Sequence, residues 1–469
     1  MRWEQLLSAK RQRESTGNLR SKEDLRSEFE KDYHRIIGSA SFRRLQDKTQ
    51  VFPLDKSDFI RTRLTHSLEV ASYAKSLGQN IGEYILNYNK DLDFTRRNKE
   101  DICNILECAG LIHDIGNPPF GHFGEVSIRE WFQKNLSRLK YKGKSIDSLL
   151  SEQMKADLYH FEGNAQALRL VSKLHYLVDE NGMNLTYALL NTMIKYPVSS
   201  TGIQASGGKI SAKKMGYYYA EKELFEDITK ATGAGQKRHP LTFILEAADD
   251  IAYKTADIED AFVKGYISYA TLAKELSALQ EREKDNPYRP LDRLEHKYQS
   301  GLSRNVSNPE EYAVKNFIVQ TQGFLINCAT FGFTSNYDSI MRGTYEKDLF
   351  KGTYGEGLME VLGDMAYRRV FTTSDIYKME MTEYVILNFL MSKFVSAILY
   401  YDTDEKLSEI DKRLVALISD NYKSAYHCQA AGKTEEEKLY LRLLLVTDYV
   451  CGMTDSYAKR LYQELNVII

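Results

Sequence analysis

The residues best suited to metal and proton chemistry are concentrated in one short stretch of this 469-residue sequence. Between Gly110 and Glu125 the chain reads GLIHDIGNPPFGHFGE, in which His113 and Asp114 are adjacent and His122 follows nine residues after His113. An imidazole beside a carboxylate forms a mixed N/O ligand set, which suits Mn, Fe, Ni, Zn or Mg better than metals that prefer sulfur. Because an adjacent His and Asp also occur by chance, the pair predicts a metal site only together with other candidate ligands.

Two further segments supply such candidates. His66 lies in an amphipathic helical pattern, and Asp249 and Asp250 are adjacent in a later apolar stretch. A buried carboxylate is costly unless its charge is compensated. A metal would compensate for that cost, but so would a Lys or Arg partner, so the pattern by itself leaves a structural ion pair open as the alternative.

Two other spacings favour helix faces with a chemical role. His122 and Glu125 are three residues apart, so on a helix the carboxylate would lie beside the imidazole and orient it as a proton donor or acceptor. Asp249, Tyr253 and Asp257 are spaced i, i+4 and i+8. Each step of four residues drifts by only about 40° around a helix, so these three side chains are expected to share one face.

Helices are expected to position all of these residues. The chain contains only 8 prolines, and apolar residues recur every three to four positions through most of it. The Asn117–Pro119 segment predicts the end of one helix, because proline removes a backbone donor and disfavours helical geometry before it. The helical patterns cover residues 25–37, 64–81, 102–112, 241–262, 310–330, 355–400, 407–427 and 434–465.

Two stretches interrupt this helical pattern. Residues 197–216 predict a long loop or a short hairpin, and residues 330–336 predict a turn or a short strand. Neither stretch is long enough to be a convincing linker between domains. We therefore expect an all-α fold, with at most a small β-hairpin, in a single large helical domain over residues 1–469.

Composition excludes several other classes of protein. Hydrophobic residues make up 43% and charged residues 27%, as in globular proteins, and the net charge of −2 excludes a globally basic nucleic-acid binder. No apolar run approaches the roughly 18–20 residues of a membrane span, and the first residues resemble no signal peptide. Five scattered cysteines without a CxxC pair predict reduced, mostly buried thiols. These features predict a cytoplasmic protein without a membrane partner.

The order His66, His113-Asp114, Asp249 resembles the H…HD…D pattern of the HD-domain metal-dependent phosphohydrolases. Within that superfamily the chain resembles the bacterial deoxyguanosine triphosphate triphosphohydrolases (dGTPases) in motifs spread from the N-terminal WEQLL almost to the C-terminus. The matching motifs are RRLQDKTQVFP at 43–53, RTRLTHSLEV at 61–70, HDIGNPPFGHFGE at 113–125, HFEGNAQ at 160–166, KYP at 195–197, EAADDIAY at 246–253 and VCGMTDSYAKRLY at 450–462.

The resemblance implies a role for individual residues of this chain. His66, His113, Asp114 and Asp249, rather than Asp250, would hold one divalent metal, with Mn, Mg and Fe all acceptable to two histidines and two carboxylates. His122 would act at the bond being broken and Glu125 would hold His122. The remaining implied contacts are with substrate: Gln50 and Asp257 with the deoxyribose 3′-hydroxyl, Tyr253 where a ribose 2′-hydroxyl would otherwise sit, and Arg63 and Lys195 with phosphates.

The resemblance further implies an HD catalytic core at 30–262, with the helical region 263–469 completing the substrate pocket and the contacts of a homo-oligomer such as a hexamer. The implied reaction converts dGTP to deoxyguanosine and inorganic tripolyphosphate. The alternatives are an HD hydrolase of broad dNTP preference and a non-catalytic nucleic-acid-binding or regulatory HD protein; single-stranded DNA is a further partner that activity does not exclude. Residues that grip the base are expected around Tyr337–Tyr345 or Arg368-Arg369, without assigned contacts.

Overall fold

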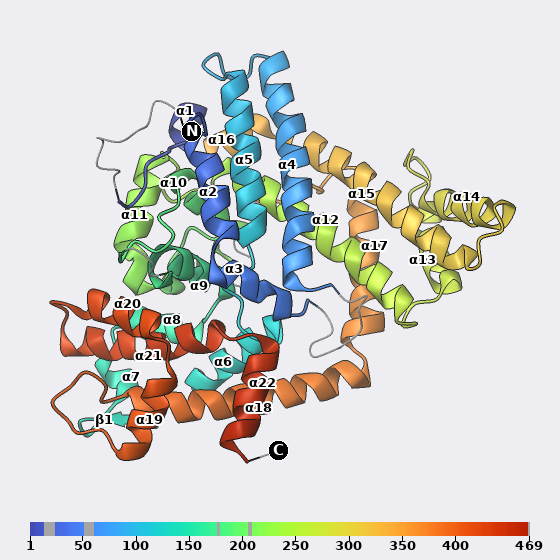
Figure 1. The fold of residues 1–469 in the computed structure, drawn as a ribbon. Helices are drawn as coiled ribbons and strands as arrows, with labels where there is room; N and C mark the ends of the chain where they lie inside the picture. The colour runs from blue at the N-terminus through green and yellow to red at the C-terminus, as the bar shows by residue number, and fades with distance from the viewer. Residues whose placement is uncertain (14–23, 51–60, 176–178, 205–208, 468–469) are drawn as a thin grey trace.

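Helices form nearly all of the regular structure in the computed structural model, which describes residues 1–13, 24–50, 61–175, 179–204 and 209–467 (Figure 1). In the first half, the helices are α1 Trp3–Leu6, α2 Glu28–Ile37, α3 Ala40–Arg44, η1 Leu45–Asp47, α4 Arg63–Asn87, α5 Arg96–Ile112, α6 Gly121–Asn135, α7 Ile146–Leu149, α8 Glu152–Tyr159, α9 Gly163–Arg169, η2 Leu170–Leu174, α10 Tyr187–Met193, η3 Ser200–Gly202, η4 Ile210–Ala212, η5 Tyr219–Glu221 and α11 Lys222–Ala231.

The second half continues in the same way. Its helices are α12 Pro240–Val263, α13 Tyr269–Arg282, α14 Pro290–Ser303, α15 Pro309–Ser335, α16 Tyr337–Arg342, α17 Glu356–Ala366, η6 Tyr367–Phe371, α18 Ser374–Ile398, α19 Glu409–Leu417, α20 Asp420–Ala430, α21 Glu435–Cys451 and α22 Asp455–Leu465. The strands β1 Lys140–Tyr141 and β2 Lys144–Ser145 pair antiparallel and form the only sheet in the described parts of the chain. The expectation of an all-α fold with a small hairpin is confirmed.

The helices α4 and α5 run side by side and carry the first two candidate histidines (Figure 1). Each helix begins with a capping box, in which Thr62 or Thr95 accepts a hydrogen bond from the third backbone N–H of its helix. The two helices come close because Gly110 of α5 faces the backbone of α4: a Cβ at this position would lie 2.5 Å from Ala71 Cα. The backbone of α5 three residues before His113 is thus pressed directly against the helix that bears His66.

We expect the substitution Gly110→Ala to destabilise the protein by about 1–3 kcal/mol, because the added methyl group forces apart two packed backbones. Chemical denaturation would measure the loss of stability. Gly323→Ala is a suitable control for the loss of glycine as such, because Gly323 also lies within a helix, α15, and no atom lies within 4 Å of a Cβ at that position. Equal destabilisation by the two substitutions would contradict the packing role of Gly110.

The long helix α12 carries Asp249, Tyr253 and Asp257, and it packs against the helices α4 and α5. His239 caps its first turn and Pro240 occupies its first position, where a missing N–H is tolerated. The helix packs against α4, α5, α10, α15 and α17, so its central residues are surrounded. The expected helix over 241–262 is confirmed.

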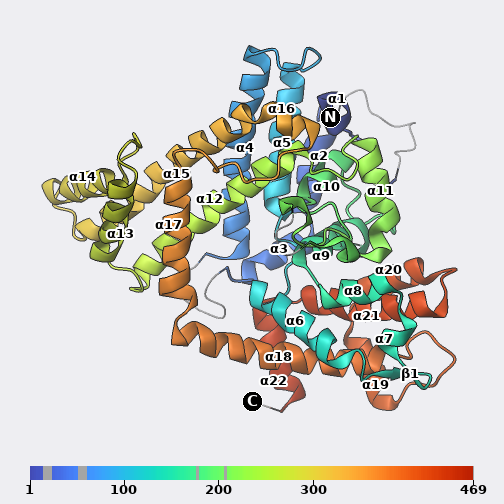
Figure 2. The same cartoon turned by 180° about the vertical axis from the view of Figure 1, so that it is seen from behind.

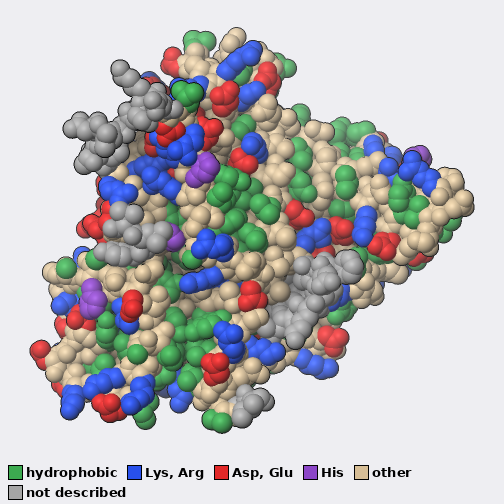
Figure 3. All heavy atoms as spheres, viewed as in Figure 1, with side chains coloured by type: hydrophobic (Ala, Val, Ile, Leu, Met, Phe, Trp, Pro, Cys, Tyr) green, Lys and Arg blue, Asp and Glu red, His purple; other side chains and the backbone are tan. Residues whose placement is uncertain are grey.

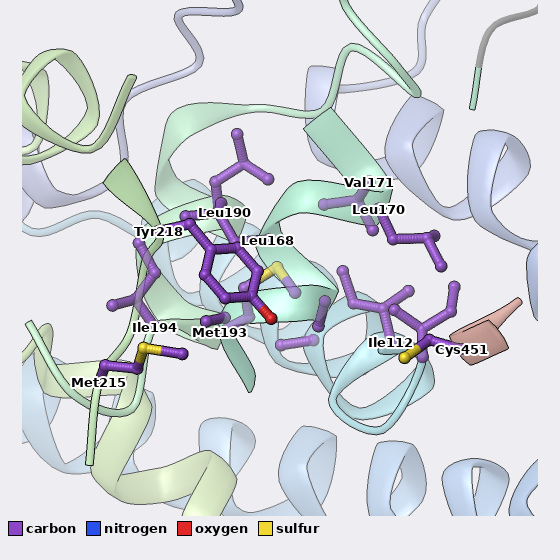
Figure 4. Close-up of a cluster of buried hydrophobic side chains, with 14 of the residues drawn as sticks. Ile112, Leu168, Leu170, Val171, Leu190, Met193, Ile194, Met215, Tyr218 and Cys451 are labelled. Carbon is purple, nitrogen blue, oxygen red and sulfur yellow. The ribbon is translucent and has the colours of Figure 1, made fainter. Parts of the chain in front are cut away.

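One large hydrophobic core extends from Trp3 to Leu461, and thus joins both halves of the chain. Figure 4 shows part of it, where Ile112, the residue before His113, and Cys451 from α21 belong to the same cluster. Cys103, Cys108, Cys328 and Cys451 are buried, as expected, whereas Cys428 is exposed. Continuous packing is consistent with the predicted single domain, but the boundary between 30–262 and 263–469 stays a prediction.

A smaller hydrophobic cluster lies beside this core and is built from α13, α14, α17 and parts of α12, α15 and α18. Figures 1 and 2 show α13 and α14 projecting from the side of the molecule opposite α20 and α21. Helix α18 is long and apolar enough to cross a membrane by length and composition alone. Half of its most apolar window is buried inside the fold, where α18 packs on α6, α19 and α21, as in the core helix of a globular protein.

Of the two predictions about irregular stretches, one is confirmed and one is wrong in the described residues. The described parts of 197–216 form the predicted loop, which contains the short 3₁₀ helices η3 and η4, and the hairpin lies at 140–145; residues 205–208, like residues 51–53 of the RRLQDKTQVFP motif, lie outside the described residues. Residues 330–335 belong to α15. The side chain of Phe333 is fully buried and Gly332 lies against the Leu349 carbonyl, so tertiary packing overrides the turn-forming composition.

Candidate metal centre and adjoining cavity

His66, His113 and Asp249 meet in space although they come from α4, the end of α5 and α12. Asp249 Oδ1 lies 3.2 Å from His66 Nε2 and 3.4 Å from His113 Nε2. One ligand atom from each residue lies within 4.8 Å of the others, a spacing that a single cation could bridge. Both histidines are buried, and Asp249 is partly exposed. The structure therefore brings together three of the four predicted ligands as a His-His-Asp cluster.

The hydrogen bonding of His113 favours metal ligation. Its Nδ1–H donates to the Gly110 carbonyl at 2.7 Å, which leaves the lone pair on Nε2 directed at the cluster. Nε2 is buried and has no hydrogen-bond partner among the described residues. Burial by itself lowers the pKa of His113, but the carboxylates of Asp114 and Asp249 outweigh burial and raise it. A divalent cation between this nitrogen and the two carboxylates would compensate their negative charge.

The fourth predicted ligand, Asp114, lies at the edge of the cluster. Its Oδ1 is 3.6 Å from His113 Nε2, and its Oδ2 forms an ion pair with Arg63. Burial would raise the pKa of Asp114, but His113 and Arg63 hold it below its usual value. The carboxylate is thus held ionised next to the three-residue cluster.

The two acids of the Asp249-Asp250 pair differ in their surroundings. Asp249 Oδ2 accepts a hydrogen bond from Lys195 Nζ at 2.9 Å, so a lysine partner and a place in the cluster occur together. Although burial opposes ionisation, Lys195 and His113 hold the pKa of Asp249 well below its usual value. Asp250 lies outside the cluster, and burial raises its pKa to about 7. This geometry favours Asp249 over Asp250 as the ligand.

His122 and Glu125 form the predicted pair on α6. His122 Nδ1 and Glu125 Oε2 are 2.9 Å apart, and Glu125 Oε1 accepts a hydrogen bond from the backbone N–H of Gly163 at 2.8 Å. Burial alone would raise the pKa of Glu125, but the hydrogen bond with His122 and the charge of Lys214 lower it. Glu125 is buried while the His122 side chain is 73% exposed, so a fixed carboxylate orients an imidazole whose other nitrogen is accessible.

A cavity of about 520 Å³ connects these groups. Its wall includes Asp249 from the His-His-Asp cluster, the neighbouring Asp114, both members of the His122–Glu125 pair, and the cations Arg63, Lys195 and Lys214. Gln50 and Tyr253 also line it, as predicted for substrate contacts. Arg61, another cation near Arg63, pairs instead with Glu69, Glu259 and Asp260 and does not line the cavity.

Asp257 lies one helical turn beyond Tyr253 on α12 but is not part of the cavity wall. It is 2% exposed, and neither carboxyl oxygen has a hydrogen-bond partner among the described residues. Burial raises the pKa of Asp257 well above its usual value. Gln50 Oε1 is likewise buried and without a partner in the described chain. These two residues are the ones that the resemblance assigns to a sugar hydroxyl, and of the two only Gln50 lines the cavity.

The expectation that residues around Tyr337–Tyr345 or Arg368-Arg369 grip the base stays a prediction, although none of these residues lines the cavity itself. Tyr337 is buried and accepts a hydrogen bond from Trp3 Nε1, and Arg368 is exposed and pairs with Glu275. The segment around those arginines does reach the cavity, but through its aromatic side chains. The cavity residues that sequence reasoning did not assign are Asn117, Phe120, Phe123, Glu162, Asn164, Lys214, Tyr367, Phe371, Ile376, Met379, Glu380 and Glu383.

Glu383 of α18 is notable among these residues because it is a buried acid without a basic partner in the described parts of the chain. Burial, together with the charges of Asp455 and Glu380, raises its pKa to about 8. Its only sequence signal was an isolated acid in an apolar helix, which by itself cannot be told from a surface position. The contribution of α18 to the cavity therefore became visible only in three dimensions.

Comparison with known proteins identifies the family. Residues 63–188 match the HD domain family, which implies that the chain binds a divalent metal. The chain is 50% identical to a deoxyguanosinetriphosphate triphosphohydrolase-like protein of Listeria monocytogenes over 99% of both chains, and 33% identical to one of Synechocystis over the full length of both. It is also 32% identical, over 93% of both chains, to the deoxyguanosinetriphosphate triphosphohydrolase of Yersinia enterocolitica. The chain therefore belongs to the deoxyguanosinetriphosphate triphosphohydrolase-like family of HD-domain phosphohydrolases.

Proposed function

We propose that this protein hydrolyses dGTP to deoxyguanosine and inorganic tripolyphosphate in a metal-dependent reaction at the α-phosphorus. The observation that carries the proposal is the shared cavity, which is lined by Asp249 of the His-His-Asp cluster, the neighbouring Asp114, an oriented imidazole and three cationic side chains. The names of the relatives support a deoxynucleotide as substrate. Hydrolysis joins water to the α-phosphorus and breaks its bond to the 5′-oxygen of the sugar.

In this proposal His66, His113, Asp114 and Asp249 hold the divalent metal. The unpartnered Nε2 of His113 and the two ionised carboxylates fit a hard or borderline cation, such as Mn, Mg or Fe. When bound, a cation here would polarise the α-phosphoryl group and make a neighbouring water more acidic. Two imidazoles and two carboxylates do not select one of these metals by themselves.

Arg63, Lys195 and Lys214 bind the triphosphate in this proposal. A triphosphate is polyanionic, so its site requires positive charge. Burial opposes the charged form of Lys195, but the Asp249 carboxylate outweighs it and raises the pKa, so the ammonium persists. The pKa of Lys214 is raised in the same way, against burial, by Glu162 and Glu125. The side chains are thus held charged and in place before the substrate arrives.

His122 supplies the proton for the leaving group. An alkoxide is a poor leaving group at neutral pH, so the departing 5′-oxygen must be protonated as its bond to phosphorus breaks. Glu125 holds His122 through Nδ1, which leaves Nε2 to donate its proton into the cavity. The buried Gly163 N–H fixes Glu125 in turn.

In this proposal Tyr253 distinguishes deoxyribose from ribose, and Gln50 and Asp257 bind the 3′-hydroxyl. The Tyr253 ring lies parallel to Phe371, with ring centroids 6.4 Å apart, so its position is fixed between α12 and η6. A ring packed against C2′ excludes the ribose 2′-hydroxyl by steric contact. The raised pKa of Tyr253, caused by burial and then by Asp257, keeps the phenol neutral.

Replacing Tyr253 by Ala is expected to reduce the preference for dGTP over GTP by up to about 10²-fold, because an apolar contact rejects an added hydroxyl by at most that factor. Comparison of kcat/KM for the two nucleotides measures this change. Tyr253→Phe retains the ring and should retain the preference. An unchanged ratio in the Ala variant would show that another residue excludes the 2′-hydroxyl.

Product analysis with each dNTP and rNTP, in the presence of Mn, Mg or Fe, tests the proposed reaction. Equal amounts of deoxyguanosine and tripolyphosphate from dGTP are expected, without orthophosphate or pyrophosphate. Release of orthophosphate or pyrophosphate would place cleavage elsewhere in the triphosphate and overturn the proposal. Tripolyphosphate from every dNTP would establish the first alternative, a broad-specificity dNTP hydrolase.

The second alternative, a non-catalytic regulatory or nucleic-acid-binding protein, has less support. A binding module does not need the His122–Glu125 pair, yet the structure holds this pair in place through two hydrogen bonds. On the face in Figure 3, basic and acidic side chains are interspersed, in keeping with a net charge of −2. Binding of single-stranded DNA would therefore be confined to a local groove and could accompany hydrolysis. Assembly into a homo-oligomer such as a hexamer, with 263–469 in the contacts, remains part of the proposal, as does a cytoplasmic location.

A further inference from the structure

The segment VCGMTDSYAKRLY at 450–462 has no role in the proposed chemistry. Its aspartate, Asp455, nevertheless forms a hydrogen bond with Phe120, a residue of the cavity wall. Asp455, the first residue of α22, is 2% exposed and accepts three hydrogen bonds from distant segments. Its Oδ1 accepts from the backbone N–H of Phe120 at 2.9 Å. Its Oδ2 accepts from Thr49, both from the backbone N–H at 2.9 Å and from the hydroxyl at 2.6 Å.

Lys48 connects the same three segments, but as a hydrogen-bond donor where Asp455 is an acceptor. Its side chain is buried, and Nζ donates to the carbonyl of Asn117 at 2.6 Å and to that of Cys451 at 2.7 Å. A donor at position 48 and an acceptor at position 455 thus tie residues 48–49, 117–120 and 451–455 together. Each of these bonds spans at least 69 residues of sequence, so none of them follows from local structure.

The segments joined in this way lead directly into two residues of the proposed active site, Gln50 and His122. Gln50 follows Thr49 directly and lines the cavity. Phe120 and Gly121 both have positive φ angles, of 65° and 60°, and form the turn that places His122 in the first turn of α6. A positive φ is strained for a residue with a β-carbon and persists where surrounding contacts hold it. The bond from Phe120 N–H to Asp455 is one such contact.

We propose that Asp455 is a positioning residue, which fixes the His122 turn and the Gln50 segment relative to each other and so sets the geometry of leaving-group protonation. This inference rests on the proposed function. Asp455 does not line the cavity and acts through the residues it holds. The closing segment of the chain thereby becomes part of the catalytic apparatus without touching the substrate.

Asp455→Asn is expected to lower kcat for dGTP by about 10–100-fold while the bound metal stays stoichiometric. The amide offers one acceptor oxygen, and its NH₂ group would face an N–H of Phe120 or Thr49, so at least one of the two connections is lost. Displacing a catalytic group by about 1 Å can cost 10²-fold. Ser456→Ala, which removes the neighbouring contact to Asp47, is the matched control and should retain wild-type kcat.

A double-mutant cycle separates positioning from general damage. If Asp455 acts through His122, D455N should change kcat by less than about twofold in a protein that already carries H122A. The same fall in both backgrounds, or a wild-type kcat in the single D455N variant, would overturn the inference. Thr49→Val, which removes only the hydroxyl donor, is a milder second variant. It should weaken dGTP binding to the H122A protein about 3–10-fold, and unchanged binding would argue against the Gln50 connection.

These results can be distinguished from a failure of the proposed function itself. A wild-type protein that does not release tripolyphosphate from any dNTP would overturn the proposed function and this inference with it. Wild-type hydrolysis together with an unaffected D455N variant would overturn only the role of Asp455.

Discussion

Replacing Asp249 by Asn is expected to remove the bound divalent metal and to lower kcat/KM for dGTP by about 10²–10⁴-fold. The Asp249 carboxylate lies within 3.4 Å of both His66 Nε2 and His113 Nε2, and it is the only carboxylate within hydrogen-bonding distance of His66 in the described chain. An amide keeps the shape of this side chain but loses its charge. Metal catalysis contributes several kcal/mol of transition-state stabilisation, and each 1.4 kcal/mol corresponds to a factor of ten.

The adjacent acid supplies a matched control for this prediction. Asp250 is on the same helix and lines the same cavity, but it is not part of the His-His-Asp cluster. Asp250→Asn should therefore retain the metal, as measured by elemental analysis of the purified protein. Loss of metal from D250N together with retention in D249N would reverse the assignment of the ligand. Retention by both variants would contradict the proposed metal centre.

Replacing His122 by Ala is expected to lower kcat by about 10²–10⁴-fold while metal content and nucleotide affinity remain close to wild type. His122 is not part of the His-His-Asp cluster, and its side chain is mostly exposed, so its removal leaves only Glu125 Oε2 unpaired while Glu125 Oε1 keeps its bond from Gly163. Single-turnover kinetics and equilibrium binding of dGTP measure the two effects separately. His427, an exposed histidine on α20 that contacts Tyr401, provides a control substitution.

Unchanged turnover in H122A would remove the proposed role of this residue. A parallel loss of metal would indicate instead that His122 supports the cluster. Glu125→Gln should give an intermediate loss of turnover, because the amide carries no charge opposite the imidazole. Its single oxygen can accept a hydrogen bond from His122 Nδ1 or from the Gly163 N–H, but not from both. In H122A, reduced turnover with the metal retained would thus support proton donation by His122, loss of the metal would indicate support of the cluster, and unchanged turnover would exclude a catalytic role.

Short-range spacing allowed much of the site to be predicted from the sequence. His113 and Asp114 are adjacent, His122 and Glu125 are one helical turn apart, and Asp249 precedes Tyr253 by four residues on α12. Residues so placed share a helix face or end whatever the rest of the chain does. The assembly of these groups around one metal was an implication of the family pattern, and the structure brings His66, His113 and Asp249 together accordingly.

The remaining parts of the cavity could not be predicted because they depend on contacts between distant helices. Tyr367 and Phe371 belong to a π-helical segment after α17, and Glu383 lies on α18, which resembles any apolar core helix in sequence. Asp455 reaches residues 49 and 120 across more than 330 positions. Hydrophobic periodicity identifies which side of such a helix is buried but not what it is buried against.

In the proposed metal centre, the position of Asp249 on α12 would set when the ligands can come together during synthesis. His66 and His113 lie within the segment that matches the HD domain, whereas Asp249 follows that segment by more than 60 residues. A nascent chain emerges N-terminus first, at roughly 5–20 residues per second, so both imidazoles leave the ribosome several seconds before the carboxylate that joins them. Binding of the cation at the proposed centre would therefore belong to the late stage of biogenesis, because a chain that ends before α12 contains the HD-domain match but lacks Asp249.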